Sequence, residues 1–329
     1  MTDLQHSSLS RRQWLQRAAA LPAFSAISAF PMIGRAQTLP ALVLGDQAGG
    51  LRALFEASKA LDGAPFSWRW ANFQGAAPLF EAQRSGAVDT AMAGDLPVLA
   101  AAVGKTPLKI VATRVGKPES LGIVVQGDSK LRSVADLRGQ TVVVSSARGS
   151  ISQYQLYGAL EEAGVRRDEV TIKFVLPTDA STAFSSKQID AWAIFDPYYT
   201  IALQNGGRIL RDGRGINTAL GFITASEEAL VDAGKRKAIV QFLDRLARAG
   251  DWALAHPEAY AQAYTQLTRL PIEASRTITA RAAVTGRPVS EADIAALQTV
   301  ADRSARDGIL PVRVDVRAIT DAQVWQRAG

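Results

Sequence analysis

Hydrophobic and polar positions along the chain follow two alternating periods. Short apolar runs bounded by polar or glycine-containing turns are typical of buried strands, and between most of them lie stretches of roughly 8 to 14 residues with helical spacing. We interpret as strands the segments 41–46, 66–73, 89–94, 108–114, 121–126, 141–146, 169–175 and 190–195. This alternation predicts an α/β fold with parallel sheets that are covered by helices on both faces.

The pattern changes at Glu227, after which almost the whole chain has helical spacing. Such a run can be a separate helical domain or a return of the chain to cover an earlier sheet. We expect the return.

A weak internal repeat favours two lobes. SGAVDTAMAGDLP (85–97) and SKQIDAWAIFDP (186–197) each place an apolar residue and an Asp ahead of a strand, and each ends at a second Asp with a Pro close behind. Asp95 and Asp196 would then be acidic N-caps at two equivalent strand-to-helix junctions. Chance similarity is the alternative. If the repeat is real, both junctions lie at the carboxyl ends of strands, where open α/β sheets bind ligands.

The N-terminus has the pattern of an export signal. Residues 10–16, SRRQWLQ, place two arginines ahead of a moderately apolar segment, and small residues allow cleavage after Ala36. The alternative is a membrane anchor, but the apolar segment is short for a hydrocarbon core of roughly 30 Å and contains two prolines. We predict a Tat-type signal over residues 1–36 and a periplasmic mature chain.

Charge and rare residues exclude several classes of function. The formal charge of +6 falls to +3 without residues 1–36, and the remaining Lys and Arg are scattered, so nucleic-acid binding is not indicated. The sequence has no Cys, hence no disulfide, thiolate metal site, Cys nucleophile or lipid-modified Cys. His256 is the only His outside the predicted signal. Metal binding and imidazole catalysis are poorly supplied, and we expect no cofactor.

Four segments then carry a family resemblance. The most specific of them is IDAWAIFDPYYTIALQNGGRILRDG (189–213). The others are GDLP (94–97), SSARGSISQYQLYGALEEAGV (145–165) and ILPVRVDVR (309–317), and all four occur in the same order as in the family. Together they resemble the aliphatic sulfonate-binding proteins of ABC importers, a class that also serves nitrate and taurine. The resemblance extends over essentially the whole mature chain.

The resemblance implies a type II periplasmic binding protein, in which two α/β lobes enclose the ligand. Residues 37–119 with 223–329 would form lobe 1, and residues 120–222 would form lobe 2. The two crossovers would lie near 113–121 and 220–225.

One departure from the family concerns the first loop, GDQAGGL (45–51). The family more often has an aromatic residue where Asp46 stands and a Ser near Gly50. An acid here would disfavour a nearby anion or suit an amine-bearing ligand, so taurine, nitrate or another small anion remain alternatives to an aliphatic sulfonate.

The loop before residue 152 is the strongest candidate for anion binding. A sulfonate needs several hydrogen-bond donors, and a helix N-terminus supplies free N–H groups at the positive end of the dipole. In ARGSIS (147–152), Gly149 and Ser150 can offer such donors, Arg148 a charged fork, and Ser146 lies in the same loop. Alternatively, Ser150 is a plain N-cap and Arg148 a solvated surface residue.

Other candidates lie at strand ends. Gln47, Gly49 and Gly50 form a loop whose glycines let the backbone approach a ligand, although a tight turn would explain them equally. Gly94 precedes Asp95, and helix capping alone would explain both Asp95 and Asp196.

Strand 190–195 raises the question of what its aromatic residues face. By strand alternation, Trp192 and Ile194 share one side, and Ala191, Ala193 and Phe195 share the other. Trp192 or Phe195 would pack on the apolar part of a ligand, with Tyr198 and Tyr199 at the entrance. The alternative places Trp192 in the core.

We therefore expect a monomeric, extracytoplasmic solute-binding protein that closes about a hinge around an organosulfonate and delivers it to an ABC permease in the inner membrane. The alternatives are an enzyme, which would have to rely on a Ser-Lys nucleophile, and a regulator domain, which would need a helix-turn-helix where the export signal stands.

Overall fold

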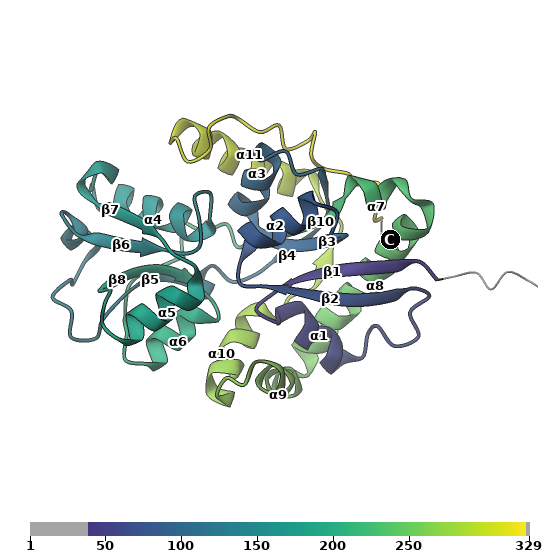
Figure 1. Cartoon of the computed structure of the whole chain (residues 1–329), viewed down its shortest axis with the longest axis horizontal. Helices are drawn as coiled ribbons and strands as arrows, with labels where there is room; N and C mark the ends of the chain where they lie inside the picture. Colours follow the sequence, from purple (N-terminus) through teal and green to yellow (C-terminus); the bar gives the residue numbers. More distant parts are fainter. Residues whose placement is uncertain (1–38, 327–329) are drawn as a thin grey trace, which may run out of the picture. The chain divides into compact units, whose positions relative to one another are not determined.

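The computed structural model describes residues 39–326, so the predicted export signal and its cleavage site lie outside the described residues. Eleven strands form two separate sheets within this part of the chain. Figure 1 shows β1 to β4 of the first sheet in purple and blue and the second sheet in teal around β6.

The first sheet has the strand order β11-β4-β10-β3-β1-β2. Its strands are β1 (Ala41–Gln47), β2 (Ser67–Phe73), β3 (Thr90–Gly94), β4 (Leu108–Val115), β10 (Leu220–Ser226) and β11 (Gly286–Arg287). The second sheet has the order β7-β6-β8-β5-β9. Its strands are β5 (Leu121–Val125), β6 (Thr141–Val144), β7 (Thr171–Phe174), β8 (Ala191–Phe195) and β9 (Arg208–Asp212).

Both sheets are mixed, which corrects the expectation of purely parallel sheets. Strand β1 pairs in parallel with β2 and β3, but β10 is antiparallel to both β3 and β4. In the second sheet β5 is antiparallel to β8 and β9. Strands β5 and β10 are those at which the chain enters the second sheet, after β4, and returns to the first, after β9; the short edge strand β11 is antiparallel to β4 as well. The alternation of strands and helices in the sequence could not reveal that these strands run in the opposite direction.

The helices are α1 (Gly50–Ser58), α2 (Ala76–Arg84), α3 (Asp95–Val103), α4 (Ile151–Glu162), α5 (Pro177–Ser185), α6 (Tyr198–Gln204), α7 (Glu227–Val231), α8 (Ala233–Ala255), α9 (Pro257–Thr268), α10 (Ile272–Ala282) and α11 (Glu291–Arg306). Three short 3-10 helices precede β5, β6 and β7, namely η1 (Pro118–Ser120), η2 (Val134–Leu137) and η3 (Arg167–Glu169). Within residues 39–326, no helix is both long and apolar enough to cross a bilayer.

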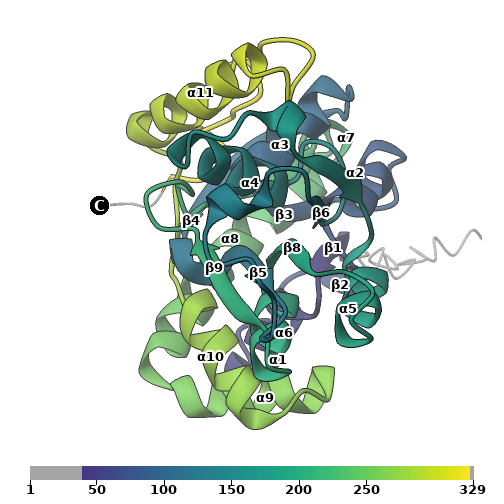
Figure 2. The same ribbon diagram turned by 90° about the vertical axis from the view of Figure 1, so that its left-hand side faces the viewer.

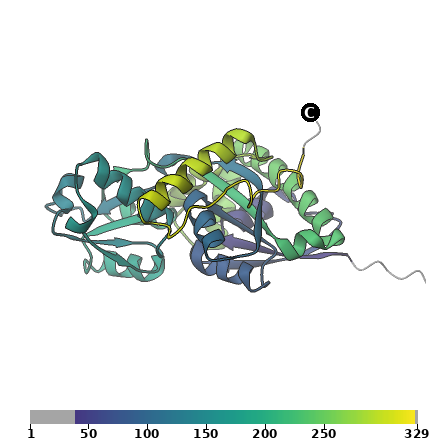
Figure 3. The ribbon, with the colours of Figure 1, turned by 90° about the horizontal axis from the view of Figure 1, so that it is seen from above.

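The helical last third covers the first sheet, as we expected in place of a separate domain. Helix α8 packs on β1 and α1, and its buried residues Phe242 and Leu243 share one core cluster with Leu42 and Leu44 of β1. Helix α11 lies over α3, which Figure 3 shows from above. In Figure 2, α11 and the pair α9 and α10 lie on opposite sides of the sheets.

Strand β8 is buried on both faces, with the alternation that its sequence predicts. Trp192 and Ile194 belong to a cluster with Phe184, whereas Ala191 and Ala193 face a different cluster beneath α4. A strand covered on both faces reads as a continuous apolar run.

Candidate functional site

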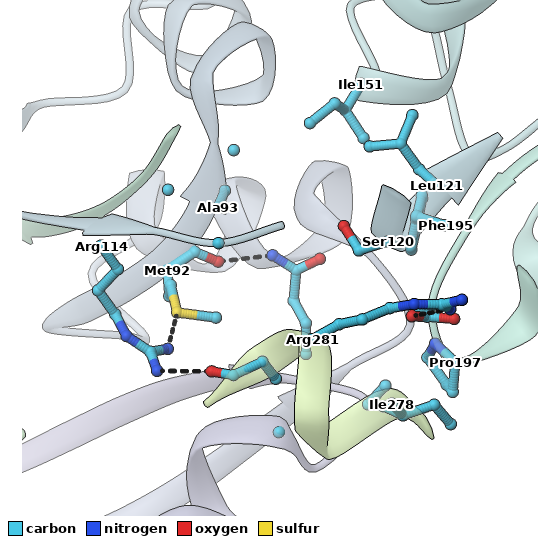
Figure 4. A pocket seen from close by; sticks show the side chains of 18 of the residues that line it. Met92, Ala93, Arg114, Ser120, Leu121, Ile151, Phe195, Pro197, Ile278 and Arg281 are labelled. Atoms are coloured by element: carbon cyan, nitrogen blue, oxygen red, sulfur yellow. Dashed lines mark hydrogen bonds and ion pairs between the residues drawn. The ribbon is translucent and has the colours of Figure 1, made fainter. Parts of the chain in front are cut away.

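A cavity of about 290 Å³ lies where strand ends of both sheets meet. The first sheet contributes the ends of β1 and β3 with parts of β4 and β10, and the second contributes the end of β8 and the start of β5. Helices α4, α9 and α10 complete the wall, and Figure 4 shows Ile151 and Arg281 pointing from two of them toward the cavity. Ligands of open α/β sheets bind at this kind of position.

Six of the predicted residues line the cavity, namely Gln47, Gly50, Gly94, Ser146, Ser150 and Asp196. The other five, Gly49, Asp95, Arg148, Gly149 and Trp192, are not among its lining residues.

The first loop is held from two sides. The Gln47 amide donates to the Met92 carbonyl at 2.6 Å, and the Gly49 N–H donates to Asn72 Oδ1 at 3.1 Å. From helix α9, the hydroxyls of Tyr260 and Tyr264 donate to the carbonyls of Gly50 and Ala48 at 3.3 and 3.2 Å. Gly49 has a φ of 77°, so a side chain here would strain the turn.

Asp46 lies behind this loop and not in the cavity. It is 1 % exposed, and its carboxylate accepts hydrogen bonds from the N–H groups of Leu51 and Arg52 in the first turn of α1. Burial raises the pKa of Asp46 to about 6, against the lowering effect of these backbone donors. Both oxygens are engaged by the helix, so the structure gives Asp46 no free oxygen for a ligand amine.

Asp95 is also buried by the fold. It is the first residue of α3, and its carboxylate accepts from the Leu96 N–H at 2.6 Å and from Thr218 Oγ1 at 2.6 Å. Burial raises the pKa of Asp95, while Thr218 opposes the shift. Gly94 is the N-cap and lines the cavity in its place, and a β-carbon there would lie 2.7 Å from Ile151 Cδ1.

The loop before α4 divides its residues between two surroundings. Ser150 is the N-cap, and its hydroxyl accepts from the Gln153 N–H at 3.3 Å. The Gly149 N–H donates to Gln153 Oε1 at 2.8 Å, so this predicted donor is already used. Gly149 has a φ of 78°, and a β-carbon on it would lie 2.7 Å from Ala100 Cβ.

Arg148 is not among the residues that line the cavity of about 290 Å³. It is exposed, lies 5.6 Å from the centre of the Phe174 ring, and lines a smaller pocket of about 180 Å³ near Glu81. Its exposure agrees with the alternative of a solvated residue, and a contact between Arg148 and the ligand stays a prediction.

Trp192 is fully buried and donates its indole N–H to Ser145 Oγ at 3.0 Å. Its face of β8 packs on α5 through Phe184, so the structure agrees with the core alternative. Phe195, at the strand end, lines the cavity instead. Tyr199 is likewise buried and does not flank an entrance.

Five helices begin at the cavity wall, and three of them already hold a carboxylate. Asp46 accepts from the first turn of α1, Asp95 from α3, and Asp196 from the Thr200 N–H of α6. Helices α2 and α4 begin at Gly75 and Ser150 without a carboxylate. An unoccupied helix N-terminus favours a bound anion.

The loops before α2 and α4 lie close together. A β-carbon built on Gly75 would lie 3.2 Å from Ser146 Oγ in the loop before α4. Among residues 39–326, no acceptor is found for the N–H groups of Ala76 and Ala77 in α2, or of Ile151 and Ser152 in α4. An anion between these ends would contact elements of both sheets.

Two lining arginines were missed by sequence reasoning. Arg281 Nη1 donates to Asp196 Oδ2 and to Thr200 Oγ1, each at 3.0 Å, and so joins α10 to the end of β8. Arg114 is 6 % exposed and donates to the carbonyls of Ala282 and Val284 just beyond Arg281 (Figure 4). The position of Arg114 at the end of the predicted strand 108–114 could have marked it as a site residue. Arg281 lies in a helical pattern that gives no such indication.

The cavity offers little for metal or nucleophilic chemistry. In the part of the chain that the structure describes, no group of three His, Asp or Glu side chains is placed to hold a metal ion. His256 lies at the junction of α8 and α9, where it stacks on Trp252 at 4.9 Å, and does not line the cavity.

Known proteins share this architecture. The model of the NMT1/THI5-like family matches residues 76–260. A protein of Escherichia coli (strain K12) that is named for binding aliphatic sulfonates is 31 % identical over 261 residues, which are 78 % of this chain and 79 % of that protein.

Two solved structures are similar over most of the chain. The alkanesulfonate-binding protein SsuA from Xanthomonas axonopodis pv. citri, bound to MOPS, matches with a TM-score of 0.79 and 28 % identity over 89 % of this chain and 100 % of that one. The periplasmic aliphatic sulphonate binding protein SsuA from Escherichia coli matches with a TM-score of 0.74 and 29 % identity over 86 % and 98 %. The two-lobed type II fold expected from the sequence is therefore confirmed.

Proposed function

The chain belongs to the NMT1/THI5-like family, and from this premise we propose that it is the solute-binding component of an ABC importer for an organosulfonate. The observation that carries the proposal is that the N-termini of α2 and α4 border one cavity, hold no carboxylate and keep free first-turn N–H groups. Relatives of high coverage that are named for sulfonate binding support the choice of anion.

The chemistry of the cavity suits a strong acid with an apolar body. A sulfonate stays ionised at physiological pH and accepts several hydrogen bonds, which free N–H groups and the dipoles of α2 and α4 can supply. The serine hydroxyls of Ser146 and Ser150 lie in the same wall. Apolar residues such as Met92, Phe195 and Ile278 line the rest of the cavity and would cover the carbon skeleton.

Binding would draw the two sheets together. In this proposal residues 37–119 and 223–329 form lobe 1, residues 120–222 form lobe 2, and the lobes rotate about the two crossover segments. The anion would contact α2 from one lobe and α4 from the other, so it would stabilise the closed arrangement more than the open one.

We also propose periplasmic action after export by the Tat-type signal, as a monomer that docks on a membrane permease. A role as a binding protein rather than an enzyme is supported by relatives that are named for sulfonate binding.

Calorimetric titration of the chain from residue 37 onward tests the proposal. We expect alkanesulfonates to bind at one site per chain, more tightly than nitrate or sulfate. Tight binding of nitrate with no response to sulfonates would refute the assignment, and preference for taurine over ethanesulfonate would support the amine-bearing alternative.

A further inference from the structure

Resting on the proposed function, we propose that Arg281 forms a second polar subsite in the cavity, and that the ligand is an organosulfonate whose tail carries a carboxylate. The sulfonate would occupy the ends of α2 and α4, and the carboxylate would meet the guanidinium of Arg281 on α10.

The first reason is the half-used guanidinium of Arg281. Its Nη1 is shared between Asp196 and Thr200, and the side chain lines the cavity with 19 % of its area exposed. Among residues 39–326, no acceptor is found for its Nε and Nη2, which form the planar fork that matches a carboxylate.

The second reason is that the fork is held in place before any ligand arrives. Asp196 Oδ1 accepts from the N–H and the hydroxyl of Thr200 at 3.1 and 2.6 Å, which fixes the carboxylate that holds Arg281. The Arg281 guanidinium carbon lies 5.4 Å from the centre of the Tyr199 ring. Arg114 anchors the chain just after Arg281 by donating to the carbonyls of Ala282 and Val284 at the end of α10. A fork fixed in this way loses little freedom on binding.

The third reason is that the surroundings of Arg281 favour a ligand group that accepts hydrogen bonds over one that donates them. Both Asp196 oxygens are engaged by Thr200 and Arg281, and Asp46 is turned toward α1. The charged side chains that line the cavity are Arg114, Lys117, Asp196 and Arg281, an excess of positive charge. Asp46 offsets part of the Arg114 charge from behind the wall. A second anionic group on the ligand would be attracted and an ammonium group repelled.

The cavity also has room for such a tail. Its volume of about 290 Å³ corresponds to roughly ten water molecules at liquid density, more than a sulfonate group alone can fill.

A matched pair of ligands tests the inference on the unmodified chain. 3-Sulfopropionate and 3-methylbutane-1-sulfonate have the same heavy-atom skeleton, with a carboxylate in one and an isopropyl group in the other. In calorimetric titration we expect 3-sulfopropionate to bind roughly 10- to 100-fold more tightly, the range for a charge-assisted hydrogen bond. Equal affinities, or tighter binding of the apolar probe, would overturn the second subsite while leaving the proposed function intact. Failure of both probes and of every other alkanesulfonate to bind would instead count against the proposed function.

Two variants identify the residue responsible. Arg281→Gln combined with Asp196→Asn removes both charges together, so no buried carboxylate is left unpaired. In this variant the preference for 3-sulfopropionate over 3-methylbutane-1-sulfonate should disappear. Arg281→Lys keeps the charge but loses the fork and should keep only part of the preference.

Arg148→Ala is the matched control, because it removes a positive charge that does not line the same cavity as Arg281; both probes carry the sulfonate, so the full preference should be kept. Equal losses for both probes in the Arg281 variants would mean that Arg281 holds the sulfonate itself and would refute the second subsite.

Discussion

The buried carboxylate of Asp46 should make the stability of the ligand-free protein depend on pH. Burial raises its pKa from 3.8 to about 6, which means that the folded protein favours the protonated form. The folded state therefore binds more protons than the unfolded state between these two values, and the free energy of unfolding falls as the pH rises through this window. A difference of about two pKa units corresponds to about 3 kcal/mol. Stability from this group is greatest below about pH 4 and levels off above about pH 6.

The test compares the wild type with Asp46→Asn, whose side chain does not titrate but can still accept one hydrogen bond from α1. Urea unfolding at several pH values between 4 and 7 gives the difference in the free energy of unfolding between the two proteins. We expect the advantage of the wild type to shrink by about 3 kcal/mol across this range.

The matched control is Asp232→Asn, which removes an exposed carboxylate that accepts from the Lys235 N–H at the start of α8. It separates the loss of a cap from the loss of a buried acid. A difference curve for Asp46→Asn that is flat, or that rises with pH, would contradict the reasoning.

Four further outcomes are expected. Trp192→Ala should lower the free energy of unfolding by about 3 to 5 kcal/mol, because it leaves a cavity in the core, and should weaken short and long sulfonates equally; a selective loss for long sulfonates would return Trp192 to the site. Arg148→Ala should leave sulfonate affinity within about twofold, whereas Ser150→Ala should lose about 1 kcal/mol of stability with its N-cap, as chemical denaturation and calorimetry would reveal. Replacing both Arg11 and Arg12 by Lys should leave the precursor inside the cell, and normal periplasmic accumulation would argue against a Tat signal.

Most of the fold could be predicted because period and length identify buried strands and amphipathic helices. The side chains that share each face of β8 could also be predicted, since strand alternation places Trp192 and Ile194 on one face. Strand β10 was anticipated only as a crossover, because the residues of a strand do not tell which neighbours it pairs with or in which direction.

The site was predicted less completely than the fold. Residues at strand ends and helix starts, such as Gln47, Gly94 and Ser150, could be found because local sequence fixes those junctions. Arg281 could not, because its role depends on α10 meeting Asp196 from a part of the chain 85 positions away. Local sequence does not tell where an exposed side chain such as that of Arg148 points, so its contact with a ligand stays a prediction.

The position of β10 has a consequence for how the chain can fold as it is synthesised. Strands β3 and β4 are consecutive in the sequence, yet β10 lies between them. Until residues 220–226 have been made, the growing chain leaves one edge of β3 and one of β4 without their partner, and unpaired edges invite wrong pairing. The second sheet, by contrast, is built from one uninterrupted segment, 121–212, and can form as soon as that segment has emerged. The part that is made in the middle is thus able to fold first, and the part that is made first must wait for the last third of the chain.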